Sequence, residues 1–187
     1  KIFKDRNLDS KSLSFYNKAI EVLNKPTISI LQFSDYNTTG MHFNAEADTS
    51  TFFNYIKAKG ITDKPPGFTG SYGIGKYAPF GVSDLKTLFI STVFQDKEGQ
   101  CKQVTQGKAI LTTFYDNDKS KRIGNGYWGI KNRYLAMEGY DCSLSDWVQR
   151  SNSEKNSPKD CGVTISVIGF NSEDHWDERI AVAIAKN

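Results

Sequence analysis

The stretch from Gly70 to Phe80, which reads GSYGIGKYAPF, is the most informative part of the chain. Its glycines at positions 70, 73 and 75 permit sharp turns and let backbone N–H groups approach a ligand that a Cβ atom would exclude. A helix expected from Lys76 to Ser83 would direct its N-terminal N–H groups to the same point, which favours phosphate. The pattern alone is weak, because glycine-rich turns also close hairpins and cap helices. It matches neither a Walker A loop, which needs a longer spacer before the lysine, nor a Rossmann fingerprint, which needs a preceding hydrophobic strand.

A second informative segment lies upstream, where the hydrophobic run from Thr27 to Phe33 predicts a buried strand that ends just before Asp35. A carboxylate beyond the end of a buried strand, followed by small polar residues and Gly40, can accept a hydrogen bond from an amino group in a pocket. Asp and Asn followed by Gly are also the usual residues of a turn. For this segment alone, the turn is the favoured interpretation.

The two segments together, SDYNTTGM (34–41) and GSYGIGKYAPFGVSDLKTLFIST (70–92), resemble the nucleotide-binding core of the GHKL ATPases. This superfamily contains gyrase B subunits, heat-shock chaperones, histidine kinases, MutL and MORC proteins, and the chain is most similar in style to the chaperone/MORC-like and bacterial defence-associated members. The resemblance implies that Asp35 accepts from the adenine amino group, that Met41 packs on the base, and that Lys76 adds charge beside the phosphates. The nucleotide-binding residues that it implies are Asp35, Asn37, Gly40, Met41, Gly70, Ser71, Tyr72, Gly73, Ile74, Gly75, Lys76 and Thr164.

The chain departs from the family pattern in three places. Asn37 occupies the position of the first glycine in the first motif, and one extra residue precedes Gly40. The late Gly-Thr motif appears as Gly162-Val163-Thr164, so either Thr164 replaces the family threonine one position late or Val163 has taken its place. The family helix with a catalytic glutamate and a magnesium-binding asparagine is not found before Asp35, and we interpret Glu21 as a solvated charge. We therefore expect a fragment of a longer protein, with the catalytic glutamate upstream and no metal ligand in this chain.

The resemblance implies an ATP-binding domain that uses ATP, Mg²⁺ and hydrolysis to drive lid closure and conformational change or homodimer formation. The alternative is a hydrolysis-deficient nucleotide sensor or protein-interaction module of the same fold. A phosphotransfer kinase of the superfamily would need a phosphoacceptor histidine on a dimerisation helix, and neither His42 nor His175 lies in one.

Composition indicates one domain over residues 1–187, with a net charge of only +3 and scattered positive residues, which does not indicate nucleic acid as a partner. The three cysteines are widely spaced, as expected for reduced thiols in a cytoplasmic protein. No apolar run reaches membrane-spanning length, so no membrane partner is expected.

Hydrophobic periodicity predicts an α+β fold: a two-layer sandwich of a mixed, mainly antiparallel sheet covered by helices. By resemblance this is a Bergerat-type ATP-binding fold, incomplete at the N-terminus. We expect helices at 10–24 and 49–59, strands at 27–33, 85–95, 108–115 and 161–170, and a final helix with Ser172 as its N-cap. The aromatic-rich insertion at about 116–158 is interpreted as a small core over one sheet edge, with a partner-binding surface as the alternative.

Overall fold

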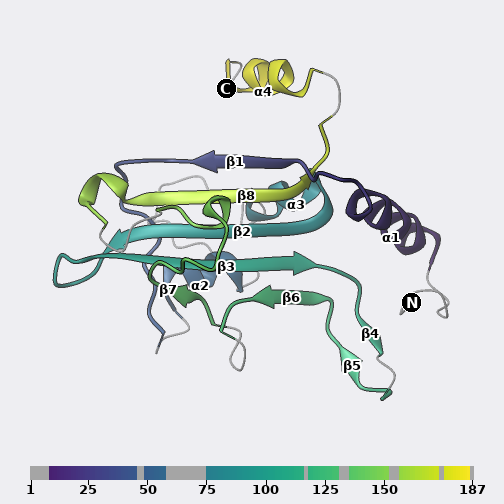
Figure 1. Ribbon diagram of the computed structural model, residues 1–187, viewed down its shortest axis with the longest axis horizontal. Coiled ribbons are helices and arrows are strands. Elements are labelled where there is room, and N and C mark those ends of the chain that lie inside the picture. The colour runs from purple at the N-terminus through teal and green to yellow at the C-terminus, as the bar shows by residue number, and fades with distance from the viewer. Residues whose placement is uncertain are drawn as a thin grey trace.

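The computed structural model describes residues 9–45, 49–57, 75–115, 118–130, 135–151, 156–172 and 175–185. Its main feature is an open six-stranded sheet with the strand order β1-β8-β2-β3-β6 and with β7 paired to β3 (Figure 1). The strands are β1 (Ile30–Ser34), β2 (Ser83–Gln95), β3 (Cys101–Ile110), β6 (Asn125–Trp128), β7 (Met137–Glu138) and β8 (Gly162–Phe170). All pairings between these described strands are antiparallel, which confirms the expectation of a mainly antiparallel α+β sheet.

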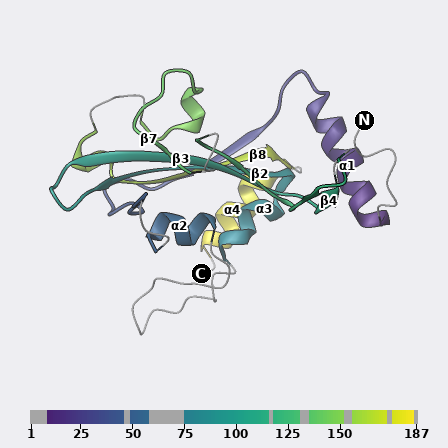
Figure 2. The same cartoon turned by 90° about the horizontal axis from the view of Figure 1, so that it is seen from below.

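The described helices flank this sheet. The helices are α1 (Ser10–Leu23), α2 (Thr51–Ile56), the 3₁₀ helix Gly75–Tyr77, α3 (Ala78–Gly81) and α4 (Trp176–Ala185). Figure 2 shows α2, α3 and α4 on one side of the sheet, whereas β7 and the segment that follows it lie on the other. The remaining elements are a two-stranded ribbon of β4 (Phe114–Tyr115) and β5 (Lys121–Arg122) and the 3₁₀ helices Asp146–Val148 and Pro158–Asp160.

The apolar core lies between the sheet and α2 and α3, on what we call the helix face. Successive side chains of a strand point to opposite sides, so the even-numbered residues of β2, such as Leu88 and Ile90, face these helices. Ile90 belongs to one buried cluster with Phe52 and Ile56 of α2, and Leu88 belongs to a second with Phe80 of α3. This packing positions α2 over the middle of the sheet.

The opposite face of the sheet carries small polar side chains and receives residues 139–151, which we call the coil segment. Ser91 accepts a hydrogen bond from the backbone N–H of Arg150 at 2.9 Å, and Ser166 donates to the carbonyl of Trp147 at 2.9 Å. The Trp147 ring also packs edge-on against Phe89, with 5.6 Å between the ring centroids. We expected the insertion to cover a sheet edge, but this segment of it lies on a face of the sheet. Part of its backbone lies outside helices and strands, and hydroxyl groups of the polar sheet face supply hydrogen-bond partners there.

Most expected elements are found, with shifted ends. The helix at α1 begins with Asp9 as N-cap, whose carboxylate accepts from Ser12 N at 3.0 Å. The β2–β3 hairpin turns at the expected residues, but its second strand starts at Cys101, earlier than the sequence indicated. The prediction of Ser172 as an N-cap is wrong, because α4 begins only at Trp176.

Candidate functional site

Asp35 directly follows β1 and ends its pairing with β8. Its backbone N–H donates to the carbonyl of Val163 at 3.1 Å, as a ladder residue would. Its carboxylate, instead of its own carbonyl, accepts the return bond from the Val163 N–H, and the second carboxylate oxygen accepts from the Thr38 hydroxyl at 3.2 Å. Asp35 thus terminates the strand as a turn residue. An ionised carboxylate has about four acceptor sites, and this side chain is exposed, so it retains capacity for a ligand donor.

The loop after Asp35 adopts the left-handed backbone that the family pattern assigns to glycine. Asn37 has φ 56°, and Asn is among the few residues that tolerate this region. Gly40 has φ 65°, and a Cβ atom at this position would overlap the carbonyl oxygen of Val93. Met41 then donates its N–H to the Thr92 hydroxyl at 2.8 Å, and its side chain packs on the core cluster beneath α2. The loop therefore leads from Asp35 onto the helix face.

The glycine segment is described only at its end. Gly70, Ser71, Tyr72, Gly73 and Ile74 lie outside the described residues, and Gly75 begins the 3₁₀ helix. The expected regular helix from Lys76 to Ser83 is instead this 3₁₀ turn followed by the single turn of α3, because Pro79 and Gly81 limit its length.

Lys76 is buried, with 9% of its surface exposed, and its ammonium group donates to the carbonyl of Asn54 at 2.9 Å. Lys108 of β3 is 4% exposed and donates to the carbonyl of Ile56 in the same way. Each ammonium nitrogen lies 5.8 Å from the centre of the Tyr77 ring. Two cations therefore meet the C-terminal carbonyls of α2, where positive charge is favourable.

Sequence reasoning found Lys76 and missed Lys108. The signal that could have found Lys108 is a lysine within a strand whose neighbours are buried, since such a lysine needs polar partners. Only the β3 register places it below the last turn of α2.

Thr164 lies on the face opposite to α2. Its hydroxyl group contacts the Ser34 hydroxyl at 2.9 Å and accepts from the Arg150 guanidinium at 3.1 Å. Val163, its neighbour in β8, packs against the core cluster on the helix face. A ligand on the helix face would therefore meet position 163, which favours the interpretation that Val163 has replaced the family threonine. Binding through Thr164 stays a prediction.

Arg150 is a second residue that sequence reasoning missed. It comes from the coil segment, yet its guanidinium donates to the carbonyl of Asp35, and its Cζ lies 4.3 Å from the centre of the Tyr36 ring. Partial burial lowers the pKa of Arg150 from its ordinary value, while the nearby Tyr36 and Asp35 oppose this shift. The guanidinium remains charged, because arginine does not deprotonate in proteins.

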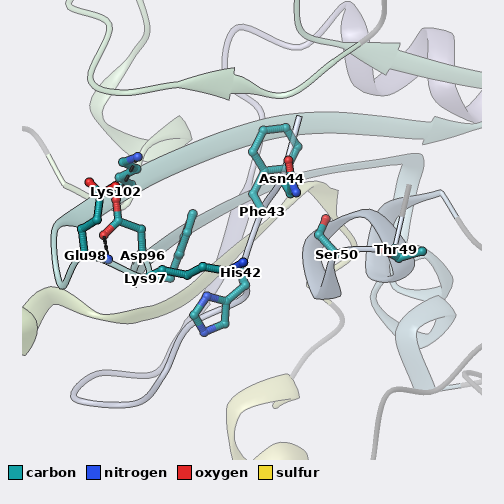
Figure 3. A pocket seen from close by; sticks show the side chains of 10 residues that line it. His42, Phe43, Asn44, Thr49, Ser50, Asp96, Lys97, Glu98 and Lys102 are labelled. Atoms are coloured by element: carbon teal, nitrogen blue, oxygen red, sulfur yellow. Dashed lines mark hydrogen bonds and ion pairs between the residues drawn. The ribbon is translucent and has the colours of Figure 1, made fainter. Parts of the chain in front are cut away.

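A pocket of about 570 Å³ lies beyond Met41, between residues 42–44, the start of α2 and the β2–β3 hairpin. Figure 3 shows Asp96, Glu98 and Lys102 gathered on the hairpin side and Ser50 on the α2 side. The ammonium of Lys102 lies 2.9 Å from Asp96, and this hydrogen bond lowers the pKa of Asp96 and raises that of Lys102. Among the described residues, the pocket lining contains none that the resemblance implicates.

Within the described part of the chain, no three His, Cys, Asp or Glu side chains are grouped as a metal site would need. The same residues include no helix with the length and apolar character required to cross a bilayer. No protein-family model matches the chain, and neither the curated proteins nor the solved structures contain a match.

Proposed function

We propose that the chain is the ATP-binding domain of a GHKL-type ATPase, in which ATP binding and hydrolysis drive lid closure and conformational change or dimerisation. The observation that carries the proposal is the burial of Lys76 directly after Gly75, with Lys108 beside it at the end of α2. Two buried cations where a glycine-rich segment ends are suited to a polyphosphate. Further support comes from Asp35, an exposed carboxylate with spare acceptor sites that leads into the loop to Met41.

In the proposed complex, Asp35 accepts a hydrogen bond from the adenine amino group and Met41 packs on the base. Lys76 and Lys108 turn their ammonium groups toward the phosphates and balance their negative charge. Mg²⁺ would accompany the triphosphate and screen its charge, but we assign it no protein ligand because the described residues group no metal-binding side chains.

The base-recognition part of the proposal is tested by calorimetry with ATP, ADP and GTP on the full chain. Replacing Asp35 with Asn turns one acceptor into an amide donor that faces the adenine amino group, so we expect ATP affinity to fall by about 10- to 100-fold, or roughly 1–3 kcal/mol. Asp84→Asn is the control, because Asp84 pairs with Lys18 at 2.9 Å on another part of the surface. Equal ATP affinity of wild type and Asp35→Asn, or a preference for GTP, would overturn the assignment.

The phosphate part is tested by comparing ATP with adenosine. Lys76→Met and Lys108→Met keep most of each side chain's length but remove its charge, so ATP affinity should fall by about tenfold while adenosine affinity stays the same. Lys86→Met is the matched control, because the Lys86 ammonium also donates to carbonyls at the end of a short helix, those of Phe80 at 3.0 Å and Gly81 at 3.2 Å. Equal losses of affinity for ATP and for adenosine would show that both buried lysines only cap α2.

The second candidate is a nucleotide sensor or interaction module that does not hydrolyse ATP. It is favoured by the position of α1, the helix that contains the exposed Glu21, because α1 lies near the start of β1 and not near the end that Asp35 follows (Figure 1). Robust Mg²⁺-dependent phosphate release by residues 1–187 would reject this second candidate.

A further inference from the structure

We propose that Arg150 is a positioning residue that orients the Asp35 carboxylate and so determines base selectivity. This inference rests on the proposed function, because it concerns how the same carboxylate meets adenine. It adds a residue that lies 115 positions away from Asp35 in the chain and belongs to the segment on the other face of the sheet.

The Arg150 guanidinium connects the end of β1 to the start of β8 through several hydrogen bonds. Its Nε donates to the carbonyl of Asp160 at 2.6 Å, and Nη1 donates to the Thr164 hydroxyl at 3.1 Å. Its Nη2 donates to the carbonyl of Asp35 and, at 3.4 Å, to that of Cys161. The planar fork of arginine can bind several acceptors at fixed angles, whereas a lysine ammonium acts as a point charge.

The bond to the Asp35 carbonyl has a direct consequence for the Asp35 side chain. In an antiparallel pair, the Val163 N–H would normally donate to the backbone carbonyl of the opposite residue, Asp35. In the structure Arg150 binds that carbonyl, and the Val163 N–H donates to the Asp35 carboxylate. Arg150 therefore selects the carboxylate orientation. Without the guanidinium, the carbonyl can resume the ladder bond and the carboxylate loses its fixed direction.

Gly162 permits this arrangement. It has φ 145°, and a Cβ atom there would overlap the Asp35 carbonyl and come within 2.7 Å of its carboxylate. The Arg150 guanidinium approaches the same point. A side chain at position 162 would thus displace the pair that we propose to orient the base contact, which provides a second, independent variant.

The nucleotide test compares selectivity with phosphate affinity in the full chain. In Arg150→Lys and Gly162→Ala we expect the ratio of ATP to GTP affinity to fall at least about fivefold, with affinity for inorganic tripolyphosphate unchanged. Gln149→Ala is the matched control, because Gln149 anchors the same coil segment by bonds of 2.9 Å to the N–H and carbonyl of Asp141 but does not touch Asp35. A retained ATP to GTP ratio in Arg150→Lys would overturn the inference.

A second readout needs no nucleotide. In NMR spectra, the substitution Asp35→Asn should shift the amide proton of Val163, which donates to the Asp35 carboxylate, and in an Arg150→Met background this response should be lost. An unchanged response would overturn the inference even if the chain binds no ATP. Conversely, wild-type ATP binding that depends on Asp35 but not on Arg150 would leave the proposed function intact and refute only the positioning role.

Discussion

Asn37 and Gly40 show how single residues determine the shape of the loop after β1. Both have positive φ values, but for different reasons. Asn37 is a side-chain-bearing residue that tolerates the left-handed region, whereas Gly40 also needs the space that a Cβ would occupy against Val93. The extra residue and the missing glycine of the family pattern therefore still permit a tight loop.

We predict that Gly40→Ala lowers the free energy of unfolding by about 2–4 kcal/mol, because left-handed strain adds to the overlap with Val93. Gly99→Ala is the matched control. Gly99 has φ 77° but open space around its Cβ position, so this variant should lower the free energy of unfolding by only about 1–2 kcal/mol. Urea unfolding measures both. Similar losses in the two variants would contradict the close approach of Gly40 to Val93.

Asn37 should tolerate replacement by a smaller residue, whereas Gly40 should not tolerate a larger one. Asn37→Gly removes the cost of a left-handed side chain and should leave stability within about 1 kcal/mol of wild type, whereas the β-branched Asn37→Val should destabilise by about 1–2 kcal/mol. The same urea experiments measure this order, and a fully tolerated valine would show that residue 37 is not left-handed in solution.

At the scale of an element, α2 is a short helix that depends on its surroundings. Ser50 caps its N-terminus by accepting from Phe53 N at 3.2 Å, and Lys76 and Lys108 bind its last carbonyls. Phe52 and Ile56 are each only 1% exposed. Isolated helices of this length are unstable in water, so tertiary contacts hold α2 in place.

The packing of α2 predicts a pH dependence through Tyr55. Burial raises the pKa of Tyr55 to about 12 from its usual 10.0. Stability from neutral Tyr55 is therefore complete below pH 10, and between pH 10 and 12 the unfolded chain ionises more readily than the folded chain. The free energy of unfolding should fall there by about 1.4 kcal/mol per pH unit.

Urea unfolding at mildly and strongly alkaline pH, on wild type and Tyr55→Phe, measures this dependence. The fall should be smaller in Tyr55→Phe, and Tyr115→Phe is the control because Tyr115 is 58% exposed. The same fall in wild type and Tyr55→Phe would mean that the Tyr55 side chain of α2 is not buried.

At the scale of the whole molecule, the sheet separates two groups of the proposed site residues. The helix face bears the buried lysines and Met41, and the opposite face receives the coil segment that carries Arg150 (Figure 2). The ends of β1 and β8 join the two sides, since Asp35 contacts Val163 and Arg150 there.

We predict that residues 1–187 bind ATP but release phosphate near the background rate, because α1, which contains Glu21, lies near the start of β1 and away from the end that Asp35 follows. Phosphate release with and without Mg²⁺ is the measurement, with Lys76→Met to show that any signal comes from this site. Robust Mg²⁺-dependent hydrolysis that disappears in Glu21→Gln would place the general base on α1 and reject the sensor.

What the sequence determined by itself is local. The alternating hydrophobic residues of β2 and β8, the turn between β2 and β3, the amphipathic α1 and the turn-forming Asp35 segment all follow from residues within a few positions of one another. These patterns predicted an α+β fold with a mainly antiparallel sheet, and the glycine segment directly before Lys76 made that lysine a candidate.

Only the tertiary structure determines the strand register, and therefore which residues lie close together. The register turns Val163 to the helix face and Thr164 away from it, and it places Lys108 beneath α2. Arg150 reaches Asp35 across 115 positions of sequence, a distance over which no local pattern operates. The physical reason is that a shift of one residue in register reverses every side chain of a strand, and only packing of the complete sheet selects between the two arrangements.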